Sequence, residues 1–152
     1  RPGESPRKVA ERLAREKAHA IFARNPRRLV LGADTIVVVR GQVLGKPRDR
    51  RDARRMLRLL SGRTHQVTTA VCLAGPGFEE VRSETTRVTM RKLSAEEIRA
   101  YAASGEPMDK AGAYAIQGLA SRFISRIEGC YFNVVGLPVP LVYRMLRAHG
   151  RL

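Results

Sequence analysis

The sequence predicts an α/β fold in which helices flank a mixed, twisted sheet. An amphipathic helical pattern opens the chain and is followed by two β-branched runs. Two further β-rich runs lie on either side of Gly75-Pro76-Gly77, which predicts an antiparallel hairpin. With 152 residues and 43% hydrophobic content, the chain has the size of one domain around one core. We therefore expect a single domain over residues 1–152.

The first half of the chain is expected to hold two helices and two short strands. Ser5 can cap the first helix, whose first turn contains Pro6, and Asn25-Pro26 stops it. In order, the predicted elements are a helix from Pro6 to about residue 24, strands over 29–31 and 36–39, a loop over 44–47 and a helix over 52–60. The polar stop after Leu31 separates the two strands.

The second half is expected to begin with the hairpin and to end with a helix. Ser94 and Glu97 form a capping box for a helix that ends at Gly105. The predicted elements are strands over 66–73 and 80–88, a helix over 94–104, a polar stretch over 105–118, a strand over 123–127 and a helix that opens at Pro138 or Pro140.

The net charge of +15 favours a polyanionic ligand, such as nucleic acid, an acidic membrane or nucleotide phosphates. Many of the 24 arginines lie on helix faces that are predicted to be solvated, and aromatic residues are only 5%. This composition argues against nucleic acid as a partner. No apolar run is long enough to span a bilayer and no leader opens the chain, so we expect a cytoplasmic protein. Cys72 and Cys130 lack metal-ligand spacing and are expected to be ordinary thiols.

Lys17 is the first residue that a purely structural interpretation leaves unexplained. At about 100° per residue, it falls near the middle of the apolar face that includes Val9, Leu13 and Ile21. An ammonium group there must be paired or must meet an anionic ligand. The alternatives are a snorkelling lysine or a structural ion pair.

Two more lysines are candidates because the chain uses arginine far more often than lysine. A chain with five lysines should keep them where a compact, flexible ammonium is required. Lys46 lies between Gly45 and Pro47 in a fixed loop, and Lys110 lies in the polar stretch. Both could bind phosphate oxygens, although a Gly-Lys-Pro tripeptide is also common in ordinary surface turns.

Asp34 follows an apolar strand, and ligands of open α/β sheets bind at the carboxyl ends of strands. A carboxylate placed there could activate water or hold Mg²⁺ beside a triphosphate. The alternative is a turn-forming aspartate that bonds its own backbone.

These residues belong to a series of motifs that resembles the Maf family over essentially the whole chain. The motifs, in order, are Gly32-Ala33-Asp34-Thr35, Leu44-Gly45-Lys46-Pro47, Leu60-Ser61-Gly62 with His65, Gly105-Glu106-Pro107 with the run from Asp109 to Tyr114, Ile116-Gln117-Gly118, and the run from Asn133 to Pro138. Any one of them is unspecific, but six in register are specific.

The resemblance implies a nucleoside triphosphate pyrophosphatase that depends on a divalent metal cation, Mg²⁺ or Mn²⁺, with a fold similar to that of inosine triphosphatases. By position, Asp34 corresponds to the family's proton acceptor, and Lys17 and Lys46 to its essential lysines. The Asp34 carboxylate could also share the metal. Thr35 and Gln117 correspond to positions that influence base selection and resemble the subgroup that acts on dTTP and UTP. Lys110 is expected to bind substrate, and relatives suggest a homodimer.

Two points qualify the resemblance. Family members begin with an apolar strand and an arginine motif that do not precede Arg1, and Ser5-Pro6-Arg7-Lys8 stands too close to Lys17 to be that motif. The alternative function is a nucleic-acid-binding or cell-division-regulating module that keeps the fold with little activity. A steep salt dependence of binding would favour this alternative.

Overall fold

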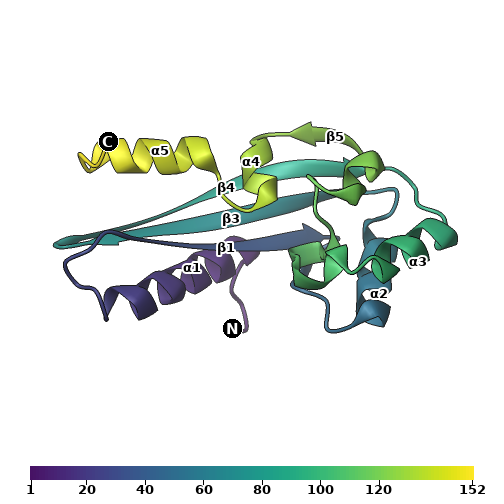
Figure 1. The fold of residues 1–152 in the computed structure, drawn as a ribbon, viewed down its shortest axis with the longest axis horizontal. Helices are drawn as coiled ribbons and strands as arrows, with labels where there is room; N and C mark the ends of the chain where they lie inside the picture. The colour runs from purple at the N-terminus through teal and green to yellow at the C-terminus, as the bar shows by residue number, and fades with distance from the viewer.

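The computed structural model describes residues 1–152 and is built on one five-stranded sheet with the strand order β2-β1-β3-β4-β5. The strands are β1 (Val30–Val39), β2 (Gln42–Leu44), β3 (Thr64–Gly75), β4 (Phe78–Met90) and β5 (Ile124–Glu128). The helices are α1 (Pro6–Phe22), α2 (Arg50–Leu60), α3 (Ala95–Ala103), α4 (Tyr131–Val135) and α5 (Val139–Ala148), with short 3₁₀ turns at Glu106–Asp109, Ala111–Ala113 and Leu119–Phe123. Figure 1 shows α1 and α5 on opposite sides of the long strands. The predicted α/β class is confirmed.

The expectation of a mixed sheet is wrong, because all four strand pairings are antiparallel. Strands β2 and β3 both run opposite to β1, so they share a direction and α2 connects them as a crossover. They are not neighbours, however, because β1 lies between them. The helical connection therefore creates no parallel hydrogen-bonded pair.

Strand β1 is continuous, although the sequence predicts two short strands over residues 29–31 and 36–39. Its backbone pairs with β3 without interruption from Val30, opposite Ala74, to Val38, opposite Gln66. The long partner strand supplies hydrogen bonds along the polar segment as well, and this overrides the local turn signal. Residues 32–35 are therefore strand.

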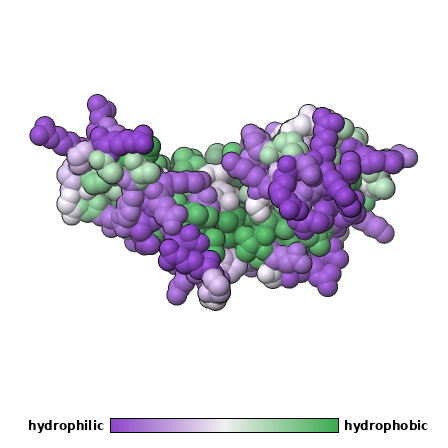
Figure 2. All heavy atoms as spheres, turned by 90° about the horizontal axis from the view of Figure 1, so that it is seen from below, coloured by the Kyte–Doolittle hydropathy of each residue, from purple (hydrophilic) through white to green (hydrophobic).

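The two faces of the sheet are covered by different helices. On one face, Ala10, Ala14 and Ala18 of α1 pack against β1 and β3. On the other face, a main core forms at one end of the sheet with α2 and α3, and α5 packs on Val71 and Leu73 at the other end. Hydrophilic side chains dominate both ends of the molecule, and apolar atoms gather in the waist between them (Figure 2).

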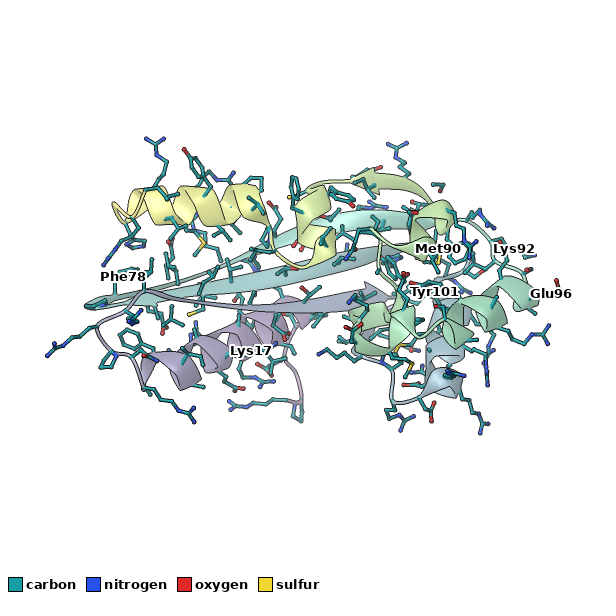
Figure 3. All side chains as sticks on the ribbon, viewed as in Figure 1. Lys17, Phe78, Met90, Lys92, Glu96 and Tyr101 are labelled. Carbon is teal, nitrogen blue, oxygen red and sulfur yellow. The ribbon has the colours of Figure 1, made fainter.

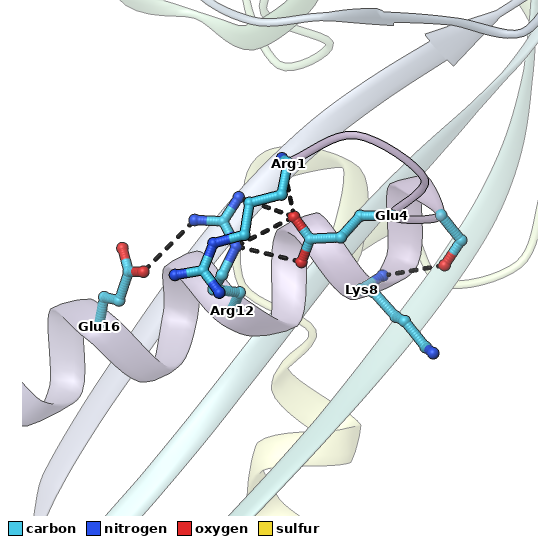
Figure 4. Close-up of polar contacts among 6 residues, drawn as sticks. Arg1, Glu4, Lys8, Arg12 and Glu16 are labelled. Carbon is cyan, nitrogen blue, oxygen red and sulfur yellow. Dashed lines mark hydrogen bonds and ion pairs between the residues drawn. The ribbon is translucent and has the colours of Figure 1, made fainter.

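The beginning of α1 is fixed by the cap that the sequence predicts. The Ser5 hydroxyl accepts a hydrogen bond from the backbone N–H of Lys8 at 3.3 Å. Glu4 accepts hydrogen bonds from Arg12, which lower the pKa of Glu4 to about 2, and Arg12 also reaches Glu16 (Figure 4). These contacts fix the start of the helix that carries Lys17.

Other local predictions are also confirmed. The Ser94–Glu97 capping box is present at the start of α3, while α2 starts slightly earlier than expected because Asp49 caps it. Cys72 is a buried thiol whose pKa burial raises to about 11, and Cys130 is half-buried. The short helix α4 was not predicted. None of the helices is both long and apolar enough to cross a bilayer.

Candidate active site

A cavity of about 320 Å³ brings together all six residues that the sequence selected as catalytic or substrate-binding. They are Lys17, Asp34, Thr35, Lys46, Lys110 and Gln117. The cavity lies where β2, which pairs only with Val37–Val39, leaves the preceding part of β1 without a partner strand on that side. A ligand can therefore reach Asp34 and Thr35, although successive side chains of a strand point to opposite faces.

Lys17 and Asp34 form an ion pair at the α1 side of the cavity. The Lys17 ammonium donates to Asp34 Oδ1 at 2.7 Å and to the Ala33 carbonyl at 3.3 Å. The Lys17 side chain is 58% exposed and the Asp34 side chain 14%. Figure 3 shows Lys17 on α1 beneath the sheet. The second oxygen of Asp34 accepts no hydrogen bond and is free for a ligand.

The expectation that Lys17 occupies the middle of the buried face of α1 is wrong. The buried stripe is made by Ala10, Ala14 and Ala18, and Lys17 flanks it. The helix lies unusually close to β1, since a Cβ atom on Gly32 would stand 2.6 Å from the Ala14 carbonyl oxygen. Small residues on both sides allow this approach and leave no room for a long side chain between helix and strand.

Asp34 does not end a strand, as the sequence suggested, but lies within β1 opposite Ala70. Its backbone is held by β3, so it is not a turn-forming aspartate. A position inside a long, paired strand mounts the carboxylate more rigidly than a loop would.

Lys46 and Lys110 lie on the opposite wall of the cavity, on two loops that a backbone hydrogen bond joins. The Gly45 carbonyl, next to Lys46, accepts a hydrogen bond from Gly112 N–H at 3.0 Å. Gly112 has a φ of +74° and a Cβ there would stand 2.8 Å from Val37 Cγ2, so only glycine fits without strain. The Asp109-to-Tyr114 motif is thereby packed against β1 beside Lys46.

Lys110 and Asp109 form a second ion pair at the cavity, with Nζ and Oδ1 3.0 Å apart. The hydrogen bond from Lys110 lowers the pKa of Asp109, and the charges of Lys110 and Lys46 act in the same direction. Asp109 is therefore ionised at neutral pH. The cavity holds three lysines and two aspartates, which leaves a positive excess suited to an anionic ligand.

Thr35 lies on the other face of β1 and belongs to a hydrogen-bonded network that the sequence did not reveal. The Thr35 hydroxyl oxygen is 2.8 Å from the Thr69 hydroxyl oxygen on β3, and the Thr69 hydroxyl donates to the backbone carbonyl of Asn133 at 3.0 Å. The buried Asn133 amide donates to the Val67 carbonyl and to the Thr86 hydroxyl. In the sequence, Asn133 stands out because it belongs to one of the motifs. Thr69 and Thr86 carry no such signal, since they are ordinary strand residues.

Gln117 is exposed at the cavity on a loop that Glu106 anchors. The Glu106 carboxylate accepts hydrogen bonds from Leu119 N–H at 3.0 Å and from the Tyr101 hydroxyl. A Cβ atom on Gly118 would overlap the Glu106 carboxylate, so a larger residue there would displace the group that anchors this loop. The Gln117 side chain itself makes no protein hydrogen bond and can turn toward a ligand.

Tyr114 lines the cavity and is supported from behind by His65. The Tyr114 hydroxyl and His65 Nε2 are 2.6 Å apart, and both side chains are buried. Burial lowers the pKa of His65 to about 4 and raises that of Tyr114. Both groups are neutral at pH 7, so this pair shapes the cavity without adding charge.

The carboxylates of Asp34 and Asp109 are the groups of this cavity that could hold a divalent cation. No cluster of three or more histidine, cysteine, aspartate or glutamate side chains exists in the structure. Mg²⁺ is commonly held by one or two carboxylates together with substrate phosphates, rather than by a complete protein cage. The free oxygen of Asp34 suits that mode of binding.

Comparisons with known proteins agree with this geometry. The sequence profile of the family described as Maf-like protein matches residues 1–149. A Koribacter versatilis protein named dTTP/UTP pyrophosphatase is 60% identical over 150 residues, which cover 99% of this chain and 78% of that protein. Proteins of the same name from Syntrophomonas wolfei and Salmonella typhimurium are 60% and 56% identical, over 98% and 96% of this chain and 80% and 75% of their own lengths. This chain belongs to the Maf-like protein family.

Proposed function

We propose that this protein hydrolyses dTTP and UTP to the nucleoside monophosphate and pyrophosphate, and so removes these nucleotides from the cellular pool. The observation that carries the proposal is the cavity itself, in which the Lys17–Asp34 pair faces two further lysines next to Thr35 and Gln117. The names of relatives up to 60% identical support the same substrates. This cavity and these relatives favour an enzyme over a module that only binds nucleic acid.

The reaction transfers a nucleotidyl group to water. The water oxygen forms a bond to the α-phosphorus, the bond from that phosphorus to the bridging oxygen breaks, and pyrophosphate leaves with the bonding electrons. Asp34 accepts the proton of the attacking water through its free oxygen or orients that water. Phosphoryl chemistry of this kind depends chiefly on positioning and on neutralising charge.

The lysines stabilise the charge that develops on the phosphates. Lys17 has one ammonium proton left after its bonds to Asp34 and Ala33, and Lys46 is held in place by the Gly45–Gly112 contact. Lys110 can exchange its exposed partner Asp109 for a phosphate oxygen, since Asp109 is 75% exposed. A divalent cation held by Asp34 or Asp109 would neutralise phosphate charge and polarise the phosphoryl oxygens.

Thr35 and Gln117 face the base. A hydroxyl and an amide can recognise the carbonyl and imide edge that uracil and thymine share. Sites that hydrogen-bond a base reject an analogue with reversed donors and acceptors strongly, by roughly 10⁴-fold, while a missing methyl changes turnover far less. dTTP and UTP are therefore both substrates, CTP is a poor one, and purine nucleotides and 7-methyl-GTP are poorer still.

The test is turnover of a nucleotide panel by the protein with Mg²⁺ or Mn²⁺, with pyrophosphate and orthophosphate measured separately. In water labelled with ¹⁸O, attack on the α-phosphorus places the label in the monophosphate. Label in the pyrophosphate or release of orthophosphate would contradict the reaction. A preference for 7-methyl-GTP over dTTP and UTP would contradict the substrate assignment alone.

A further inference from the structure

The hydrogen-bonded network behind Thr35 determines which way its hydroxyl proton points. The backbone carbonyl oxygen of Asn133 can only accept a hydrogen bond. The single proton of the Thr69 hydroxyl is therefore used in its 3.0 Å bond to that oxygen. Thr69 then has only lone pairs to offer in its 2.8 Å contact with Thr35. The Thr35 hydroxyl is consequently the donor in that contact.

The same argument fixes the rest of the network. Thr86 donates to the Cys130 carbonyl at 2.8 Å and therefore accepts from Asn133. The two amide protons of Asn133 are used on the Val67 carbonyl and on Thr86, so the amide cannot flip without losing both bonds. Asn133, Thr69 and Thr86 are each 0% exposed. Bulk solvent therefore does not reach these three side chains, and the Asn133 side-chain oxygen is the one buried acceptor of the network without a protein partner.

What Thr35 presents to the cavity is then its lone pairs. The only protein partner of its hydroxyl is Thr69, and a Cβ atom built on Gly136 would stand 4.0 Å from the Thr35 oxygen, on the side where both residues line the cavity. A hydroxyl whose proton is committed can only accept from a ligand.

We propose that Thr69 is a positioning residue for substrate selection, which holds Thr35 as a hydrogen-bond acceptor that matches a pyrimidine with a protonated N3. This inference rests on the proposed function. Uracil and thymine carry N3–H, which can donate to Thr35. Cytosine at neutral pH offers an N3 lone pair at the same place, so two acceptors face each other and CTP is rejected.

The decisive experiment compares kcat/KM for UTP and CTP, which share the ribose, the phosphates and the ring size. Thr69→Val removes the acceptor of the Thr35 proton, so Thr35 becomes free to donate to cytosine. We expect kcat/KM for CTP to rise and the UTP-to-CTP ratio to fall by about tenfold or more. Thr69→Ser keeps the hydroxyl and should retain the wild-type ratio.

Two controls separate positioning from general loosening of the site. Thr86→Val damages the same network but not its contact with Thr35, so the UTP-to-CTP ratio should stay at the wild-type value. In a Thr35→Val background, Thr69→Val should no longer change the ratio, because the group through which Thr69 acts is gone. Equal losses for both nucleotides in Thr69→Val, or the same ratio change in the Thr35→Val background, would overturn the proposal.

Thr35→Val alone provides a test that does not depend on the folding of Thr69→Val. Loss of the acceptor should lower kcat/KM for UTP by about tenfold or more, while kcat/KM for CTP should hold or rise, because the oxygen that faces the cytosine N3 lone pair is gone. A larger loss for CTP would show that Thr35 is a donor and would overturn the inference. Failure of the proposed function is distinct, because wild-type protein would then release no pyrophosphate from UTP.

Discussion

The Lys17–Asp34 pair allows a catalytic role to be separated from a structural one by a single substitution. Lys17→Met removes the ammonium but keeps most of the apolar stem. Lys17 is 58% exposed and Asp34 is partly accessible, so solvent screens the pair and it contributes about 1 kcal/mol or less. In a domain of this size, 1 kcal/mol corresponds to a change in melting temperature of about 2–4 °C. A fully buried pair would instead cost about 3–5 kcal/mol when broken.

Turnover should respond very differently. Lys17 donates to the carboxylate that we propose acts on water, and it lines the proposed phosphate site, so Lys17→Met should lower kcat/KM for dTTP by on the order of 10² or more. The assay combines thermal unfolding with pyrophosphate release. Arg12→Met is a matched control, since it breaks ion pairs to Glu4 and Glu16 on the same helix but does not line the cavity. It should retain turnover.

A catalytic role for Lys17 is refuted if Lys17→Met lowers the melting temperature by more than about 10 °C while the folded protein keeps near-normal turnover. That result would assign the pair to stability. The companion change Asp34→Asn retains an acceptor for Lys17 and should fold, with turnover reduced on the order of 10² or more.

Three further predictions follow from other contacts. Gly32→Ala should lower stability by about 1–3 kcal/mol and also reduce turnover, because the new Cβ atom meets the backbone of α1 and moves Lys17. An unchanged melting temperature and unchanged kinetics would contradict the close approach of α1 to β1. His65 has a pKa of about 4 in the folded protein against an ordinary 6.5, so the unfolded state binds more protons between these pH values. The free energy of unfolding should therefore fall by about 3 kcal/mol as the pH drops from 6.5 to 4. Urea unfolding of His65→Gln should show a weaker dependence of this free energy on pH. Gln117→Glu should narrow the preference for dTTP and UTP in competition assays, because a carboxylate lacks the donors of the amide; an unchanged preference would remove Gln117 from base selection.

The sequence alone located most of the helices and selected six residues that line one cavity. Capping signals located α1 and α3 because a cap is a contact between residues three apart, which the sequence contains directly. The scarcity of lysine drew attention to Lys17, Lys46 and Lys110, and all three line one cavity. Asp34 was selected by its place after an apolar strand, and the motifs in register added Thr35 and Gln117; all three line the same cavity.

Only the tertiary structure decided how these residues are mounted. The pairing with β3 turned two predicted strands into one and placed Asp34 inside it, because the hydrogen bonds that hold residues 32–35 come from a strand more than thirty positions away. The contact of Gly32 with α1 moved Lys17 from the centre of a buried face to its edge. The direction of the Thr35 proton depends on Thr69 and on Asn133, which is 64 positions further along the chain from Thr69. Local sequence patterns record neighbours along the chain, whereas these three features arise from partners that meet only when the chain folds.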